Sequence, residues 1–79
     1  MIRIVFLGKL ADVAGEPQRE VAGPLDWDGL LAALGSDLAA SAQNQRTKIA
    51  VDGEVLPDKA ALSALEGSEI ALLPPVSGG

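Results

Sequence analysis

The first segment of the chain has the pattern of a β-strand that is apolar on both faces. Residues 2–7 are rich in β-branched and other apolar side chains, which favours a strand. Its two faces would carry Ile2, Ile4 and Phe6 on one side and Arg3, Val5 and Leu7 on the other. Residues 18–22 can form a second strand around Val21. These strands predict an N-terminal hairpin whose long loop, residues 9–15, has room for a helical turn.

A helical repeat of apolar residues follows this hairpin. Asp26 is a suitable N-cap residue for the helix. Behind it one apolar stripe consists of Trp27, Leu30, Leu31 and Leu34. Gly29 interrupts the helix at a cost of up to about 1 kcal/mol relative to alanine, and Gly35 suits the left-handed residue that ends it. Residues 36–43 can form a second short helix, capped by Ser36.

The second half of the chain predicts three short strands and one more helical segment. Asp52-Gly53 lies between two β-type segments, and Asp-Gly is a preferred pair for a two-residue type I′ hairpin. Pro57 would stop the second of these strands because it lacks an amide hydrogen. The predicted segments are strands at 48–51, 54–56 and 69–73, a short helical or 3₁₀ segment at 59–65 and a turn at 66–68.

This order, β-β-α-β-β-(helical turn)-β, predicts one two-layer α+β domain with a mixed sheet. A single main helix can cover only one face of that sheet. The other face would expose an apolar patch beside the C-terminal end, unless loops cover it, and such patches often mark partner surfaces. We therefore expect Leu7, Val55 and Leu73 to contribute to a partner-binding face.

The inventory of reactive side chains is unusually small. The 79 residues include no cysteine and no histidine, which removes thiolate chemistry and the commonest general base and metal ligand. Asp26 and Asp28 are close together, but their place at a helix start favours capping and first-turn charges over catalysis. Trp27 lies on the apolar stripe, which favours core packing over a ligand platform. No side-chain catalytic site and no metal site are expected.

Charge and hydropathy narrow the classes of partner. The net charge of −5 argues against nucleic acid and against an anionic membrane surface. The apolar N-terminal segment is too short for a signal peptide, and no stretch approaches the roughly 20 apolar residues of a spanning helix. A cytoplasmic location is the resulting expectation.

The chain ends in a segment with a distinctive shape. Pro74 and Pro75 cannot continue a strand ladder, and they favour a stiff polyproline II conformation. Gly78 and Gly79 carry no side chain and could thread a narrow channel. At about 3.1 Å per residue, residues 74–79 would reach on the order of 18 Å from the sheet. A cloning scar or a frayed end is the competing interpretation.

The C-terminal residues, Glu69-Ile70-Ala71-Leu72-Leu73-Pro74-Pro75-Val76-Ser77-Gly78-Gly79, resemble the ending of the molybdopterin synthase small subunits, which are ubiquitin-like sulfur carriers. The opening segment, residues 2–11, and the hairpin around Asp52-Gly53 are also similar to that family. The resemblance departs at Ser68, where the family often has aspartate, and at Leu72-Leu73, where aromatic residues are common.

The resemblance implies a β-grasp domain over residues 1–73, with about five strands on one main helix, and a flexible tail over residues 74–79. It implies that Gly79 is the catalytic group, through its α-carboxylate, and that the subunit acts as a sulfurtransferase within a heterotetrameric synthase. The tail residues that would insert into a partner are Pro74, Pro75, Val76, Ser77 and Gly78. The chain itself would bind no cofactor.

The same resemblance implies three protein partners. An adenylating, E1-like activating enzyme would use ATP and Mg²⁺ to adenylate the terminal glycine. A sulfur donor protein would convert it to a thiocarboxylate, and the large subunit of molybdopterin synthase would receive the sulfur for a pterin precursor. Three alternatives remain open: a ubiquitin-like modifier joined to lysines, a carrier for thiamine thiazole synthesis, and a purely structural domain.

Overall fold

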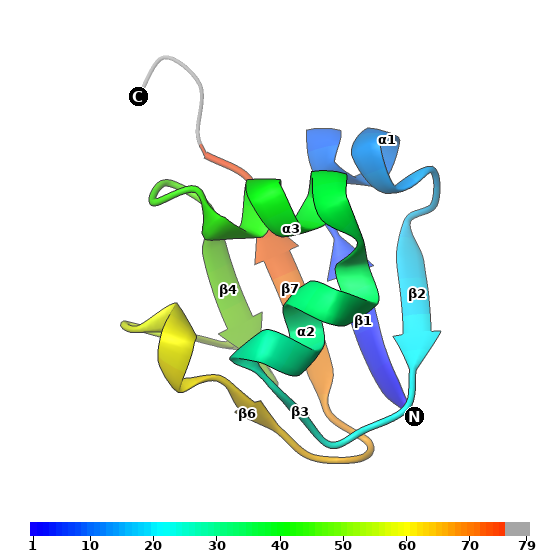
Figure 1. Ribbon diagram of the computed structural model, residues 1–79, viewed down its shortest axis with the longest axis vertical. Coiled ribbons are helices and arrows are strands. Elements are labelled where there is room, and N and C mark those ends of the chain that lie inside the picture. The colour runs from blue at the N-terminus through cyan, green and yellow to red at the C-terminus, as the bar shows by residue number, and fades with distance from the viewer. Residues whose placement is uncertain (76–79) are drawn as a thin grey trace.

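The computed structural model describes residues 1–75, and it contains the predicted mixed sheet (Figure 1). The sheet has the order β2-β1-β7-β4-β5. Its strands are β1 (Ile2–Phe6), β2 (Gln18–Val21), β4 (Lys48–Val51), β5 (Glu54–Val55) and β7 (Glu69–Leu73). β1 runs parallel to β7, and the other neighbouring strands are antiparallel. The last strand of the chain therefore lies in the middle of the sheet.

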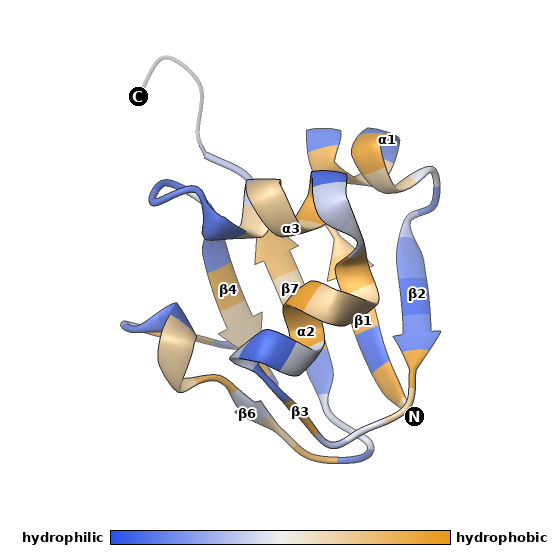
Figure 2. Cartoon of the chain, viewed as in Figure 1, coloured by the Kyte–Doolittle hydropathy of each residue, from blue (hydrophilic) through white to orange (hydrophobic). Residues whose placement is uncertain are grey.

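One face of the sheet forms the hydrophobic core, and the alternation in the sequence selects that face. β1 buries Ile2, Ile4 and Phe6, as predicted, while β7 buries Ile70 and Leu72. Figure 2 shows hydrophobic residues along most of β1, and Arg3, the one polar residue of this strand, is exposed. The helices supply the other half of this core through Leu10, Leu30, Leu34, Leu38 and Ala42. Burying these side chains provides the main stabilisation of so small a domain.

Two eight-residue helices, α2 (Trp27–Leu34) and α3 (Ser36–Gln43), cover the core face of the sheet (Figure 1). The predicted cap of α2 is confirmed, because the Asp26 carboxylate accepts a hydrogen bond from the Gly29 amide at 2.7 Å. The predicted Ser36 cap of α3 is wrong. Gly35 occupies the N-cap position instead, with φ 86°, and the tight joint between the two helices leaves Ser36 inside α3. The second short helix expected at residues 36–43 is confirmed as α3, so two packed helices, and not one main helix alone, cover this face.

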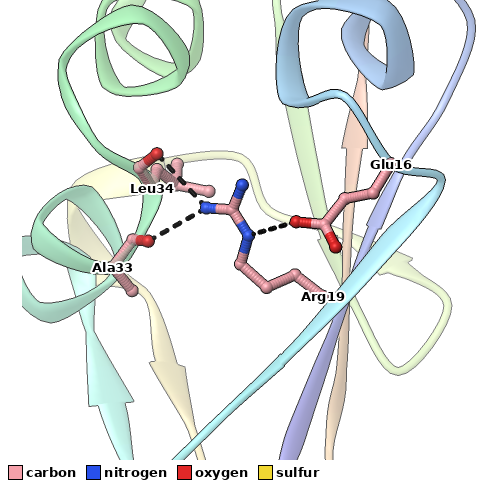
Figure 3. A network of polar contacts seen from close by, with 4 residues as sticks. All are labelled: Glu16, Arg19, Ala33 and Leu34. Carbon is pink, nitrogen blue, oxygen red and sulfur yellow. Dashed lines mark hydrogen bonds and ion pairs between the residues drawn. The ribbon is translucent and has the colours of Figure 1, made fainter.

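Arg19 on β2 connects the sheet to the end of α2, where α2 meets α3 (Figure 3). The sequence alone did not predict a role for this residue. Its guanidinium donates to the carbonyl oxygens of Ala33 and Leu34 at 3.1 and 3.3 Å, at the end of α2. The Nε atom donates to the Glu16 carboxylate at 2.8 Å. The guanidinium also lies 5.3 Å from the centroid of the Phe6 ring. One edge-strand side chain therefore satisfies helix carbonyls that would otherwise lack partners.

Short elements complete the fold. α1 (Lys9–Ala14) is the helical turn expected between the first two strands. A second sheet joins β3 (Leu25–Asp26) to β6 (Ser63–Ala64), and only part of the predicted helical segment at 59–65 is helical, as the 3₁₀ helix η1 (Lys59–Ala61). The type I′ turn is consistent with the left-handed φ values of Asp52 and Gly53, 50° and 87°.

Candidate functional site

The candidate site begins where β7 ends, because the proline pair directly follows this strand. Leu73 is the last residue of β7 and lies opposite Lys48, the first residue of β4. Pro74 and Pro75 are half-buried. The predicted insertion residues Val76, Ser77 and Gly78, and the predicted reactive residue Gly79, lie outside the described residues. The central position of β7 means that the chain leaves the sheet between β1 and β4 (Figure 1).

Gly8 packs against Pro74, the first residue of the tail. Its backbone has φ 55° and ψ −134°, a conformation that L side chains rarely adopt. A Cβ atom added to Gly8 would lie 3.1 Å from Cγ of Pro74. The proline ring therefore packs against the space that a side chain would occupy, so Gly8 sets the position at which the tail leaves the sheet. Sequence reasoning missed this residue; its only signal was a glycine directly after a strand.

The sheet face opposite the helices is apolar around the base of the tail. The strand register places Val5, Ala71, Ala50 and Val55 in one row across four strands. Leu73 and Leu7 extend this row toward the tail, and the Leu7 amide continues the ladder by donating to the Leu72 carbonyl oxygen at 3.2 Å. Leu7 is 40% exposed and Val55 is 54% exposed. The structure thus brings the three predicted partner-face residues to one surface, and their role in binding stays a prediction.

This apolar face is partly exposed in residues 1–75: Leu7 and Val55 are exposed, Val5, Ala71 and Leu73 are half-buried, and Ala50 is buried. The helices contact one another, α1 with α3, α2 with α3 and α2 with η1, on the core side of the sheet. We call this surface the outer face and define it by its residues: Val5, Leu7, Ala50, Val55, Ala71 and Leu73. The apolar patch expected from the sequence is thus exposed at Leu7 and Val55 and less exposed between them.

Lys59 fixes the loop that leads into β4, beside the base of the tail. Its ammonium donates to the carbonyl oxygens of Ala42, Asn44 and Thr47 at 2.7, 2.7 and 3.0 Å. Burial, together with the nearby Lys48 ammonium, lowers the pKa of Lys59 from its usual value. The ammonium also lies 5.9 Å from the Trp27 ring, so the predicted core tryptophan has a cationic neighbour. Lys59 is therefore a structural residue.

Residues 1–75 contain no group of three or more His, Cys, Asp or Glu side chains that could hold a metal ion. The pair Asp26 and Asp28 serves the start of α2, as expected from the sequence. Over the same span, no helix has the length and apolar character needed to cross a membrane.

A family model for the ThiS family matches residues 4–79, nearly the whole sequence. The chain belongs to the ThiS family of ubiquitin-like sulfur carriers. The match includes the terminal Gly78-Gly79 pair. No curated protein sequence matches the chain significantly.

Solved structures agree with this family fold. SAMP1 from Haloferax volcanii is 25% identical, with 99% of this chain and 98% of that chain covered and a TM-score of 0.67. The complex of subunits 1 and 2 of molybdopterin-converting factor from Helicobacter pylori gives 23% identity, 99% and 97% coverage and a TM-score of 0.67. The BexX/CysO complex from Amycolatopsis orientalis gives 17% identity, full coverage of both chains and a TM-score of 0.73. The ubiquitin-like β-grasp fold expected from the sequence is confirmed.

Proposed function

We propose that this ThiS-family chain is the sulfur-carrier subunit of a molybdopterin synthase, with the α-carboxylate of Gly79 as its working group. The observation that carries the proposal is the family match, which extends through the terminal diglycine. The Pro74-Pro75 pair before the diglycine, which follows the central strand β7, supports the synthase assignment among sulfur carriers. The absence of cysteine and histidine from the sequence leaves the terminus as the group suited to carry sulfur.

The proposed chemistry has two balanced steps. A carboxylate oxygen of Gly79 attacks the α-phosphorus of ATP, held with Mg²⁺ in the activating enzyme, and pyrophosphate leaves. The resulting acyl-adenylate has AMP as a good leaving group. A sulfur donor at the oxidation level of sulfide then attacks the carbonyl carbon and displaces AMP, which leaves a thiocarboxylate on Gly79. The large subunit of the synthase receives this sulfur for the pterin precursor.

The geometry suits a carrier that visits several enzymes. Residues 74–79 can extend on the order of 18 Å in a polyproline-like conformation, far enough to enter a neighbouring active site. The outer face adjoins the base of this tail and is available for docking through Leu7, Val55 and Leu73. Because one face must serve the activating enzyme and the large subunit in turn, neither complex can be permanent. A heterotetramer of two carriers and two large subunits is the expected active assembly.

A second candidate function is that of a protein modifier, joined through Gly79 to lysine side chains. The similarity to SAMP1, a small archaeal modifier protein, favours it. Sulfur carriage in thiamine thiazole synthesis remains a third candidate within the same family. All three functions use an activated C-terminus, and they differ in the molecule that accepts the sulfur or the glycyl group. The experiments must therefore identify this acceptor.

The first experiment measures the intact mass of the protein after incubation with ATP, Mg²⁺, the activating enzyme and a sulfide source. Replacement of the terminal hydroxyl by a thiol adds about 16 mass units. Deletion of Gly79 should abolish this gain, whereas Ser77→Ala, which retains the terminus, should keep it. A truncated protein that still gained sulfur would refute the role of Gly79.

The second experiment identifies the acceptor. The thiocarboxylated protein is offered separately to the molybdopterin synthase large subunit with pterin precursor, to a thiazole synthase and to a lysine-bearing lysate. Turnover in the first reaction alone supports the proposal. Turnover in the thiazole reaction, or stable lysine conjugates without pterin sulfuration, would assign the chain to the corresponding alternative.

A further inference from the structure

The six cationic side chains of this acidic protein are divided into two groups by the fold. Three of them have partners inside the domain: Arg3 pairs with Glu69, Arg19 with Glu16, and Lys59 with three carbonyl oxygens. The other three are Lys9, Arg46 and Lys48. All three are exposed, and none forms an ion pair with a carboxylate of residues 1–75.

The three remaining cations lie around the base of the tail. Lys48 begins β4 and lies opposite Leu73, the residue before Pro74. Arg46 precedes Lys48 by two residues, in the loop that Lys59 holds in place. On the other side of the tail, Lys9 directly follows Gly8, which packs against Pro74. Figure 1 shows the start of β4, the end of β7 and α1 at the same end of the sheet.

The opposite end of the sheet is acidic. The strand register places Glu20 and Glu69 on either side of Arg3, and the Asp52 carboxylate accepts from the Glu69 amide. Glu66 lies at the same end, in the turn before β7. The chain therefore has a net charge of −5 but a cationic end, and this end is the one from which the tail leaves. Asp12 on α1 and Glu16, which Arg19 binds, are the carboxylates nearest in sequence to Lys9.

We propose that Lys9, Arg46 and Lys48 form a cationic rim that docks against carboxylates around the tail channel of the activating enzyme. This inference rests on the proposed function, because it needs an enzyme that takes the tail. The physical reason is geometric: any protein that receives residues 74–79 must cover the surface from which they emerge. The activating enzyme is the first to do so, since it must bind the carrier before sulfur is added.

Such a rim would act mainly on encounter and orientation. The acidic body of the carrier is repelled by an acidic enzyme surface, whereas the cationic end is attracted to it. Only orientations that present the tail to the channel are then favoured. Charges at the edge of an interface typically alter association rates, and their effect weakens when salt reduces the screening length to a few ångströms.

The test compares two variants of equal net charge in the adenylation reaction, followed by pyrophosphate release. Lys9→Gln/Lys48→Gln removes one cation on each side of the tail and changes the net charge from −5 to −7. Ala22→Glu/Ala32→Glu reaches the same net charge through exposed positions away from the tail. We expect the rim variant to raise KM for the carrier about tenfold at low ionic strength, with little change in kcat. The control variant should stay within about twofold of wild type.

Each outcome bears on a distinct claim. A KM equal to that of the control variant, or a rise that salt does not diminish, would overturn the cationic rim while leaving the proposed function intact. A change in KM for ATP instead of KM for the carrier would show that the cations reach nucleotide phosphates, which also overturns the proposal. Failure of the wild-type chain to be adenylated would overturn the proposed function itself, and the rim with it.

Discussion

Replacement of Arg19 by alanine should destabilise the domain more than any single surface charge normally does. The guanidinium connects three elements at once, because it reaches from β2 to the last carbonyls of α2, to Glu16 and to the Phe6 ring (Figure 3). Its side chain is only 26% exposed, so these contacts are partly shielded from water. The alanine variant would leave the end of α2 without this cation.

The magnitude follows from the separate contacts. The two hydrogen bonds to helix carbonyls, with the favourable helix dipole, contribute about 1–2 kcal/mol at this partial exposure. The contact with the Phe6 ring adds about 0.5–1 kcal/mol. The pair with Glu16, which is 42% exposed, adds at most about 0.5 kcal/mol. These contributions sum to a loss of about 1.5–3.5 kcal/mol in the free energy of unfolding, which for so small a domain lowers Tm by roughly 6–28 °C.

Urea denaturation followed by tryptophan fluorescence measures this loss, because Trp27 begins the helix that Arg19 supports. Glu16→Ala removes only the exposed ion pair and should cost no more than about 0.5 kcal/mol. Arg19→Lys keeps the charge but cannot make the forked contacts, so its stability should lie between those of wild type and Arg19→Ala. Equal stability of Arg19→Ala and Glu16→Ala would refute the claim that the guanidinium stabilises the end of α2.

Three further predictions concern the site and its surroundings. Leu73→Asp should leave folding intact, because this side chain lies on the outer face. It should weaken binding to the activating enzyme and to the large subunit about tenfold or more. Unchanged affinity for both partners, measured by titration calorimetry, would contradict a shared docking face. Gly8→Ala should lower the free energy of unfolding by about 1–3 kcal/mol, because the residue has a positive φ, and it should displace Pro74. Wild-type stability in urea would argue against the packing of Pro74 on Gly8. Hydrogen bonds from the N-terminal ammonium and from the Gly23 amide lower the pKa of Glu66 below its usual 4.5. The ionised Glu66 carboxylate therefore stabilises the folded state above that pH, and this contribution is lost as the pH falls through the folded-state pKa. In the Glu66→Gln variant the urea midpoint should therefore fall less steeply as the pH is lowered.

Local patterns predicted much of the fold. The alternation in β1, the stripe and cap of α2 and the Asp52-Gly53 turn depend on residues within a few positions of one another, and each is found where it was expected. The core and outer faces of the sheet followed from the same alternation. The features that the sequence analysis did not predict depend on contacts between residues that are distant in sequence. β3 and β6 are two residues each and exist because they pair across the domain, and Ser36 is not a cap because the joint between two helices is set by Gly35.

The candidate site shows the same division. Its tail sequence and the three residues Leu7, Val55 and Leu73 were predicted from the chain, and the structure brings these three to one face. Gly8 could not be found in this way, because its importance comes from Pro74, which is 66 positions away in sequence. The neighbourhood of Lys48 likewise depends on the pairing of β4 with β7.

The sequence by itself carries the proposal about chemistry. The lack of cysteine and histidine and the Pro-Pro-Val-Ser-Gly-Gly segment favour the proposed role of the Gly79 carboxylate, and this reasoning needs no coordinates. Only the tertiary structure decided what surrounds the base of that tail. The parallel pairing of β1 with β7, and the antiparallel pairing of β4 with β7, bring three features to one end of the sheet. These are Gly8, the part of the outer face formed by Leu7 and Leu73, and the cations Lys9, Arg46 and Lys48. Composition is a property of the chain, whereas proximity between distant residues arises only when the sheet forms.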